Sequence, residues 1–140
     1  MRVVTPIVVV AALIAVAPAA ATKSTSTTTA SVVDTKSWCK AVIDANTRAG
    51  TMKDKRFLAP SKITPILWKK VVDAAVSNGG EFIALAPGSI KTAVTHEIAY
   101  YRHIKANHYS TTTPLAPMTL ADVKKIMDFE RTQCGITFAT

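Results

Sequence analysis

The two cysteines, Cys39 and Cys134, constrain the fold of this chain more than any other feature of its sequence. In an oxidising compartment an isolated pair of cysteines usually forms one disulfide. A bridge that closes so long a loop would stabilise the fold by roughly 4–5 kcal/mol in the chain-entropy model. Two cysteines cannot make a structural zinc site alone. We therefore predict a Cys39–Cys134 disulfide that joins the first helix to the C-terminal segment, with no bound metal or cofactor.

The N-terminal residues 1–21 predict that the chain enters such a compartment. Arg2 supplies a positive start, residues 3–16 are almost entirely apolar, and the small residues 19–21 form a cleavage pattern. This is the composition of a secretory signal peptide. The apolar run is shorter than the roughly 20 residues that span a bilayer. We expect a secreted, extracellular protein with no stable membrane insertion once the signal has been removed.

The remainder divides into residues 22–33, a flexible Ser/Thr-rich leader, and residues 34–140, a single globular domain. Apolar periodicity predicts four helices in this domain. Their expected ranges are 35–47, 65–78, 90–108 and 120–131. Short strands are expected at 81–86 and 136–139, with residues 82–85 pairing with 136–138. The predicted fold class is a small, helix-dominated α+β domain with a short two- or three-stranded sheet and one disulfide.

Local signals at the helix ends support these ranges. Asp34, Thr64, Ser89 and Thr119 are of the residue types that cap helix N-termini. The sequence 78–80, Asn-Gly-Gly, predicts the end of the second helix.

Positive charge is concentrated in residues 53–70. The formal net charge of the chain is +8, and removal of Arg2 with the signal leaves one charge fewer. Asp54 is the only acid in this stretch, and its basic residues are Lys53, Lys55, Arg56, Lys62, Lys69 and Lys70. Such a block favours anionic partners such as nucleic acid, acidic lipid or acidic cell-wall polymer. A charged face that only maintains solubility is the alternative.

A dibasic pair, Lys55-Arg56, lies in a predicted loop. Proteases of the secretory pathway that recognise paired basic residues are able to cut such loops where the backbone is exposed. Cleavage after Arg56 would place the two cysteines on separate pieces joined by the disulfide.

Groups suited to proton transfer recur on the predicted third helix. His96, Tyr100 and His103 fall on one polar stripe, and Glu97 falls within the apolar stripe beside it. The two histidines are candidates for a general acid and base, with Glu97 and Tyr100 as further candidates. Seven residues of helix separate the histidines by roughly 10 Å, which works against this role. A buried Glu97 that is paired or hydrogen-bonded is the structural alternative.

These observations favour a small secreted, effector- or toxin-like protein that binds an anionic target outside the cell. That target would be a membrane surface, a cell-wall polymer or nucleic acid, although a protein of a target cell also fits. The alternative is a small secreted hydrolase, a nuclease-like toxin that uses the stripe on the third helix. No nucleophile motif, P-loop or dinucleotide fingerprint is present. The sequence leaves the choice between enzyme and binding protein open and favours the latter, and it does not define the oligomeric state.

Overall fold

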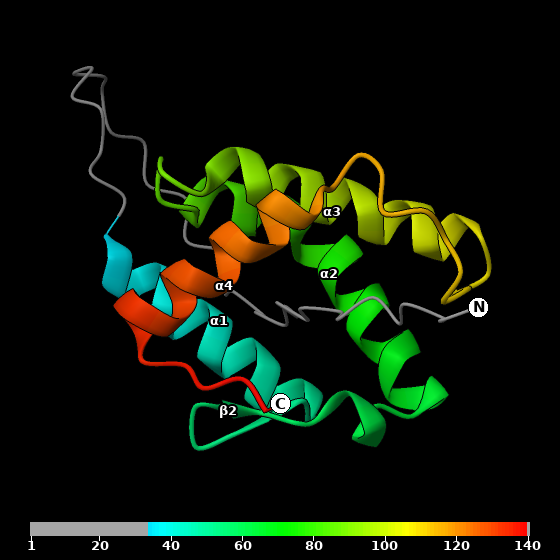
Figure 1. Cartoon of the computed structure of the whole chain (residues 1–140), viewed down its shortest axis with the longest axis horizontal. Coiled ribbons are helices and arrows are strands. Elements are labelled where there is room, and N and C mark those ends of the chain that lie inside the picture. The colour runs from blue at the N-terminus through cyan, green and yellow to red at the C-terminus, as the bar shows by residue number, and fades with distance from the viewer. Residues whose placement is uncertain (1–33, 140) are drawn as a thin grey trace, which may run out of the picture.

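The computed structural model describes residues 34–139, which form a small α+β domain dominated by helices (Figure 1). Within these residues lie four α-helices, one two-stranded antiparallel sheet and one disulfide, as the sequence predicts. The predicted signal peptide and the leader up to residue 33 lie outside the described residues.

Helix α1, Thr35–Ala49, follows its predicted range closely. The side chain of Asp34 caps it by accepting a hydrogen bond of 3.0 Å from the backbone N–H of Lys36. Gly50 ends it with a φ of 82°, a left-handed conformation that glycine adopts without steric cost. Trp38 and Val42 point into the core.

The loop predicted around Lys55-Arg56 is instead a tight hairpin. Strands β1, Met52–Lys53, and β2, Arg56–Phe57, pair through a two-residue turn. Asp54 and Lys55 both have positive φ in this turn, 50° and 59°, which matches the twist of a type I′ hairpin. The short 3-10 helix η1, Pro60–Lys62, follows and leads into the second helix.

Helix α2, Pro65–Leu85, begins as predicted and ends later than predicted. Thr64 accepts a hydrogen bond of 3.2 Å from the N–H of Leu67, and Pro65 occupies the first helical position. The predicted terminator at 78–80 and the predicted strand 81–86 are wrong, because the helix runs through both. Gly79 is buried where α2 packs against the next helix: a Cβ there would lie 2.4 Å from Cγ2 of Ile98. This glycine permits close helix contact rather than ending the helix.

Helices α3, Lys91–Ala106, and α4, Leu120–Cys134, complete the bundle. Ser89 does not cap α3, whose N-cap is Ile90 with no side-chain hydrogen bond. Thr119 caps α4 as predicted, in a capping box with Asp122.

The C-terminal segment does not form the predicted strand 136–139, and its predicted pairing with 82–85 is wrong because those residues are helical. Thr137 instead makes an isolated parallel bridge to Arg56. The N–H of Phe57 donates to the carbonyl of Thr137, and the N–H of Thr137 donates to the carbonyl of Lys55, both at 2.9 Å. The hairpin that carries the dibasic pair is therefore tied to the C-terminus by backbone hydrogen bonds.

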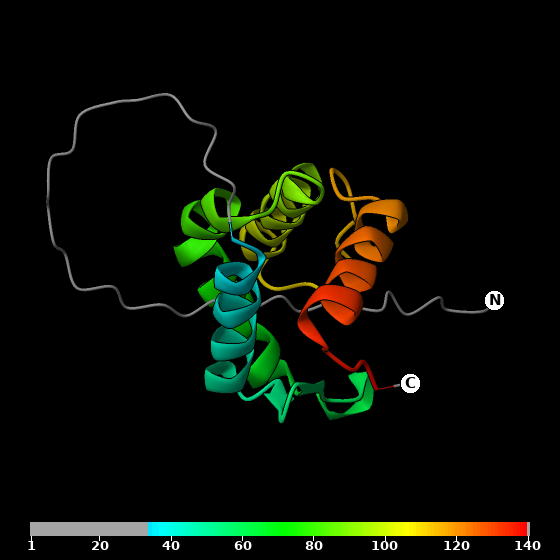
Figure 2. The same ribbon diagram turned by 90° about the vertical axis from the view of Figure 1, so that its left-hand side faces the viewer.

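The helices enclose one hydrophobic core. Helix α3 packs against α2 and α4, while α1 packs against α2 and α4 from the other side (Figure 2). Trp38 of α1 meets Phe82 of α2 edge-on, with ring centroids 5.4 Å apart. No helix within residues 34–139 has both the length and the apolar character needed to cross a membrane.

Candidate functional site

The six basic residues predicted to bind an anionic target are all exposed. Their elements, the β1–β2 hairpin, η1 and the first turns of α2, lie along one end of the molecule, at the bottom of Figure 1. We call this region the basic end; its residues are Lys53, Lys55, Arg56, Lys62, Lys69 and Lys70.

Outside residues 53–70, three acids of the described chain, Asp44, Asp73 and Asp128, pair with lysine or arginine side chains. On α1, Lys40 pairs with Asp44, and on α4 both Lys124 and Arg131 pair with Asp128. Helical spacing of three or four residues brings each of these pairs together. Residues 53–70 contain one acid, Asp54, which lies in the hairpin turn. The positive charge of the basic end is thus poorly compensated by its own segment.

Asp73 of α2 links the basic end to α3. Its carboxylate accepts a hydrogen bond from Lys69 Nζ at 2.6 Å, one from the Tyr109 hydroxyl at 2.7 Å, and pairs with Lys105 Nζ at 3.0 Å. The hydrogen bond from Lys69, followed by those from Tyr109 and Lys105, lowers the pKa of Asp73 to about 2 against the opposing effect of partial burial. The hydrogen bonds to Asp73 and Tyr109 in turn raise the pKa of Lys69.

Sequence reasoning missed this cluster. The spacing of Lys69 and Asp73 is a detectable signal, because residues four apart face each other on a helix. The approach of Lys105 and Tyr109 depends on the packing of α3 against α2, and no local pattern reports it. Lys69 also lies over the Tyr109 ring, 4.6 Å from its centroid.

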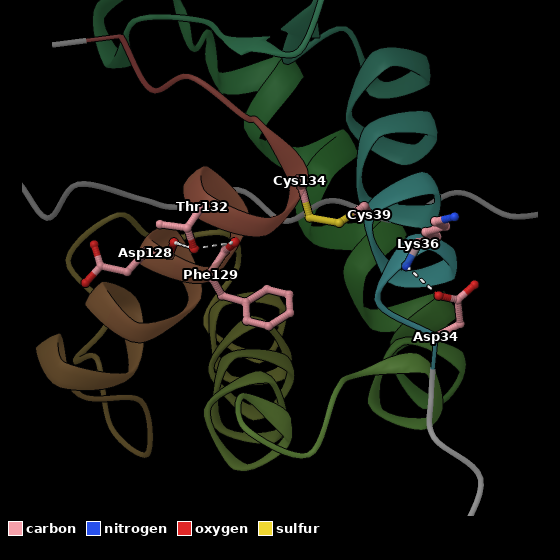
Figure 3. The surroundings of a disulfide bond; sticks show 7 residues. All are labelled: Asp34, Lys36, Cys39, Asp128, Phe129, Thr132 and Cys134. Atoms are coloured by element: carbon pink, nitrogen blue, oxygen red, sulfur yellow. Dashed lines mark hydrogen bonds between the residues drawn. A yellow bond between two sulfur atoms is a disulfide. The ribbon is translucent and has the colours of Figure 1, made fainter.

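A groove beside the disulfide is lined by lysines of α1 and by Lys55 of the hairpin. It has a volume of about 370 Å³ and lies between α1 and the end of α4. Cys39 and Cys134 line it, as do Lys36, Lys40 and Lys55. Figure 3 shows the disulfide that joins the two helices, with the capped start of α1 on one side and the last turns of α4 on the other.

The histidine stripe of α3 is only partly as predicted. His96 is half-buried and His103 is exposed, but Tyr100, placed between them on the polar stripe, is buried with an exposed fraction of 2%. Burial raises the pKa of Tyr100. The structure therefore does not extend an exposed polar surface through Tyr100 from one histidine to the other.

His96 has a partner that the sequence analysis missed. Its Nδ1 lies 3.0 Å from Oδ2 of Asp122, the carboxylate of the α4 capping box. Partial burial alone would raise the pKa of Asp122, but hydrogen bonds from His96 and Thr119 bring it below its usual value. A carboxylate in this position orients an imidazole ring, which is one element of general-base chemistry.

Glu97 is buried, as its place in the apolar stripe predicts, and a second carboxyl group lies in the same core. Both Glu97 and Glu130 are almost fully buried, with exposed fractions of 1% and 0%. Burial raises the pKa of Glu130 to about 8. Burial raises the pKa of Tyr101 well above its ordinary value, and electrostatic interactions with Glu97, Tyr100 and Glu130 raise it further. Sequence reasoning missed Glu130, although it interrupts the buried stripe of α4 that Val123, Ile126 and Cys134 form.

No group of three or more metal-binding side chains occurs within residues 34–139. Comparison with known proteins finds no family model that matches the chain, and no curated protein or solved structure with significant similarity to it.

Proposed function

We propose that this chain is a small secreted effector- or toxin-like protein that binds an anionic target outside the cell through its basic end. The target class is a membrane surface, a cell-wall polymer or nucleic acid. The observation that carries the proposal is the exposure of all six basic residues on neighbouring elements at one end of the fold. Exposed lysines and arginines attract phosphate and carboxylate groups over distances of about 10 Å at moderate salt.

The disulfide supports the extracellular part of this proposal. Structural disulfides persist in oxidising compartments and are rare in the reducing cytosol. The bridge between Cys39 and Cys134 joins the two ends of the described domain. The predicted signal peptide at residues 1–21 accounts for how the chain would reach such a compartment.

A panel of anionic probes tests the proposal. Vesicles containing phosphatidylglycerol, a polyuronate and single-stranded RNA represent the three target classes. We expect the protein to bind at least one of them, and the Lys62→Gln/Lys70→Gln variant to bind it roughly tenfold more weakly or worse, since each lysine near an anionic surface contributes about 1 kcal/mol. Failure to bind any probe at low salt would overturn the proposal.

The matched control removes the same charge from another part of the molecule. Lys91 begins α3 and Lys125 lies on α4, and both are exposed. The Lys91→Gln/Lys125→Gln variant should keep most of the affinity of the unmodified chain. An equal loss in both variants would mean that net charge, and not the basic end, governs binding.

A hydrolase that uses His96 is the second candidate, and the hydrogen bond that His96 donates to the carboxylate of Asp122 favours it. The burial of Tyr100 and the spacing of the histidines weigh against it. We expect RNA to stay intact during incubation with the protein. Degradation that disappears in the His96→Ala/His103→Ala variant would establish the nuclease in place of a simple binding protein.

A further inference from the structure

Two large apolar side chains among residues 34–139 are exposed to solvent, Ile66 at 83% and Leu120 at 73%. Single exposed apolar residues are common on protein surfaces and carry no meaning alone. Leu120 begins α4 in the turn that holds the acid Asp122. Ile66 lies in the first turn of α2, within the basic end.

The helix places lysines around Ile66. Lys69 and Lys70 lie three and four residues further on, and so share its face of the helix one turn away. Lys62 precedes it in η1. Of these three lysines, Lys69 is the one whose ion pair, with Asp73, is seen within the described residues. Ile66 therefore shares the start of α2 with Lys70, a lysine for which no ion pair is seen within residues 34–139, and follows Lys62, for which none is seen either.

Ile66 is held in this exposed position by its neighbours. Thr64 caps the helix and Pro65 fixes the backbone of the first turn. Ile63 and Leu67, on either side, are only partly exposed, and Ile63 packs against the core. Ile66 is therefore 83% exposed in a capped first turn of α2.

We propose that the basic end docks on the surface of a bilayer rich in anionic phospholipids, with Ile66 entering the headgroup region and Lys62 and Lys70 contacting lipid phosphates. This inference rests on the proposed function and names its target. Lysine stems lie along an apolar boundary while their charged ends reach the phosphates. Nucleic acid and cell-wall polymers offer the same charges but no apolar phase for Ile66, and this difference favours the membrane.

Vesicle sedimentation with matched variants tests the inference. Vesicles of phosphatidylglycerol and phosphatidylcholine are compared with vesicles of phosphatidylcholine alone. We expect the full chain to bind the anionic vesicles, and Ile66→Ser to weaken that binding about tenfold or more, since the transfer of one large aliphatic side chain out of water is lost. Leu120→Ser, which removes an equally exposed side chain outside the basic end, should bind as the unmodified chain does.

An insertion reporter gives a second, independent readout. Tryptophan at position 66 or 120 is exposed in solution, so its emission shifts to the blue only when it leaves water. We expect a blue shift on adding anionic vesicles to Ile66→Trp and none for Leu120→Trp, each measured relative to the unmodified chain.

The outcomes separate this inference from the proposed function. Equal binding of Ile66→Ser and the unmodified chain to anionic vesicles, with no blue shift at position 66, would overturn docking through Ile66 and leave an electrostatic interaction in place. Tight binding to RNA or polyuronate without vesicle binding would assign another anionic target and overturn the membrane inference. Absence of binding to all probes would overturn the proposed function as well.

Discussion

At the scale of single residues, Glu130 is a carboxyl group buried in the core at a cost in desolvation. Both of its carboxylate oxygens are buried and have no hydrogen-bond partner within the described residues. Desolvation without compensation favours the neutral acid, which explains why its pKa rises from 4.5 to about 8. Near neutral pH the folded chain thus keeps a proton on Glu130 that the unfolded chain releases.

This raised pKa predicts a loss of stability with rising pH. Between about 4.5 and 8 the folded state binds more protons than the unfolded state at this group, so the free energy of unfolding falls as the pH rises through that window. Below about 4.5 both states are protonated and the contribution levels off. Glu130→Gln removes the titration, and we expect urea unfolding of this variant to depend less on pH between 5 and 8. Glu81→Gln, at an exposed position, is the control; an unchanged pH dependence in Glu130→Gln would contradict the prediction.

At the same scale, sequence reasoning found some of these groups and not others. Glu97 stands out because it interrupts an apolar stripe, and the structure confirms that it is buried. The partner of Lys69 is Asp73 on the same helix, whereas the partner of His96 is Asp122 on another helix. A contact between side chains 26 residues apart, as between His96 and Asp122, depends on how two helices pack, which periodicity in one helix does not specify.

At the scale of elements, the helices were predictable where caps and apolar periodicity agree. Asp34, Thr64 and Thr119 cap their helices as predicted. The error at residues 78–80 has a definite cause: Gly79 permits close contact with α3, and sequence alone does not separate this use of glycine from the ending of a helix. The hairpin was missed because its strands have two residues each, too few to show alternation.

The two glycines of α2 predict opposite effects of the same substitution. Gly80 is exposed in the helix, and a Cβ there would meet nothing within 4 Å. Gly80→Ala should therefore raise the free energy of unfolding by about 0.5–1 kcal/mol. Gly79→Ala would drive its methyl group into Ile98, whose β-branched side chain is stiff, and should lower stability by about 1–3 kcal/mol.

Chemical denaturation of the two single variants measures both effects on one scale. The two positions are adjacent in one helix, so differences in helix propensity cancel in the comparison. A stabilised Gly79→Ala variant would show that α2 and α3 are not packed as closely as described here.

At the scale of the whole molecule, the disulfide and the distribution of charge define what the fold presents to a partner. Cys39 and Cys134 join the first helix to the last, and the C-terminal segment is hydrogen-bonded to the hairpin through Thr137. The side chains of Lys55 and Arg56 are exposed, but the backbone on both sides of Arg56 is hydrogen-bonded to Thr137. Cleavage after Arg56 would first require the hairpin to separate from the C-terminal segment.

Charge pairing makes the surface more polarised than composition alone implies. The chain has 9 acidic and 17 basic residues. Two of the acids, Glu97 and Glu130, are buried, Asp44 and Asp128 pair with cations of their own helices, and Asp73 pairs with Lys69 and Lys105. Of the six residues of the basic end, Lys69 is therefore the one with an ion pair within residues 34–139. The residues of the basic end could be predicted from the sequence. The ion pairs by which Asp73 joins Lys69 of the basic end to Lys105 of α3 could not.

The salt dependence of binding, measured on the tightest-binding anionic probe, shows whether the basic end recognises the target. When surface lysines contact anions, the logarithm of the affinity falls steadily as the logarithm of the salt concentration rises. We expect a shallower fall for Lys62→Gln/Lys70→Gln and an unchanged slope for Lys91→Gln/Lys125→Gln. Binding that is insensitive to salt, or a slope that the two variants share, would contradict a role for the basic end in recognising its target.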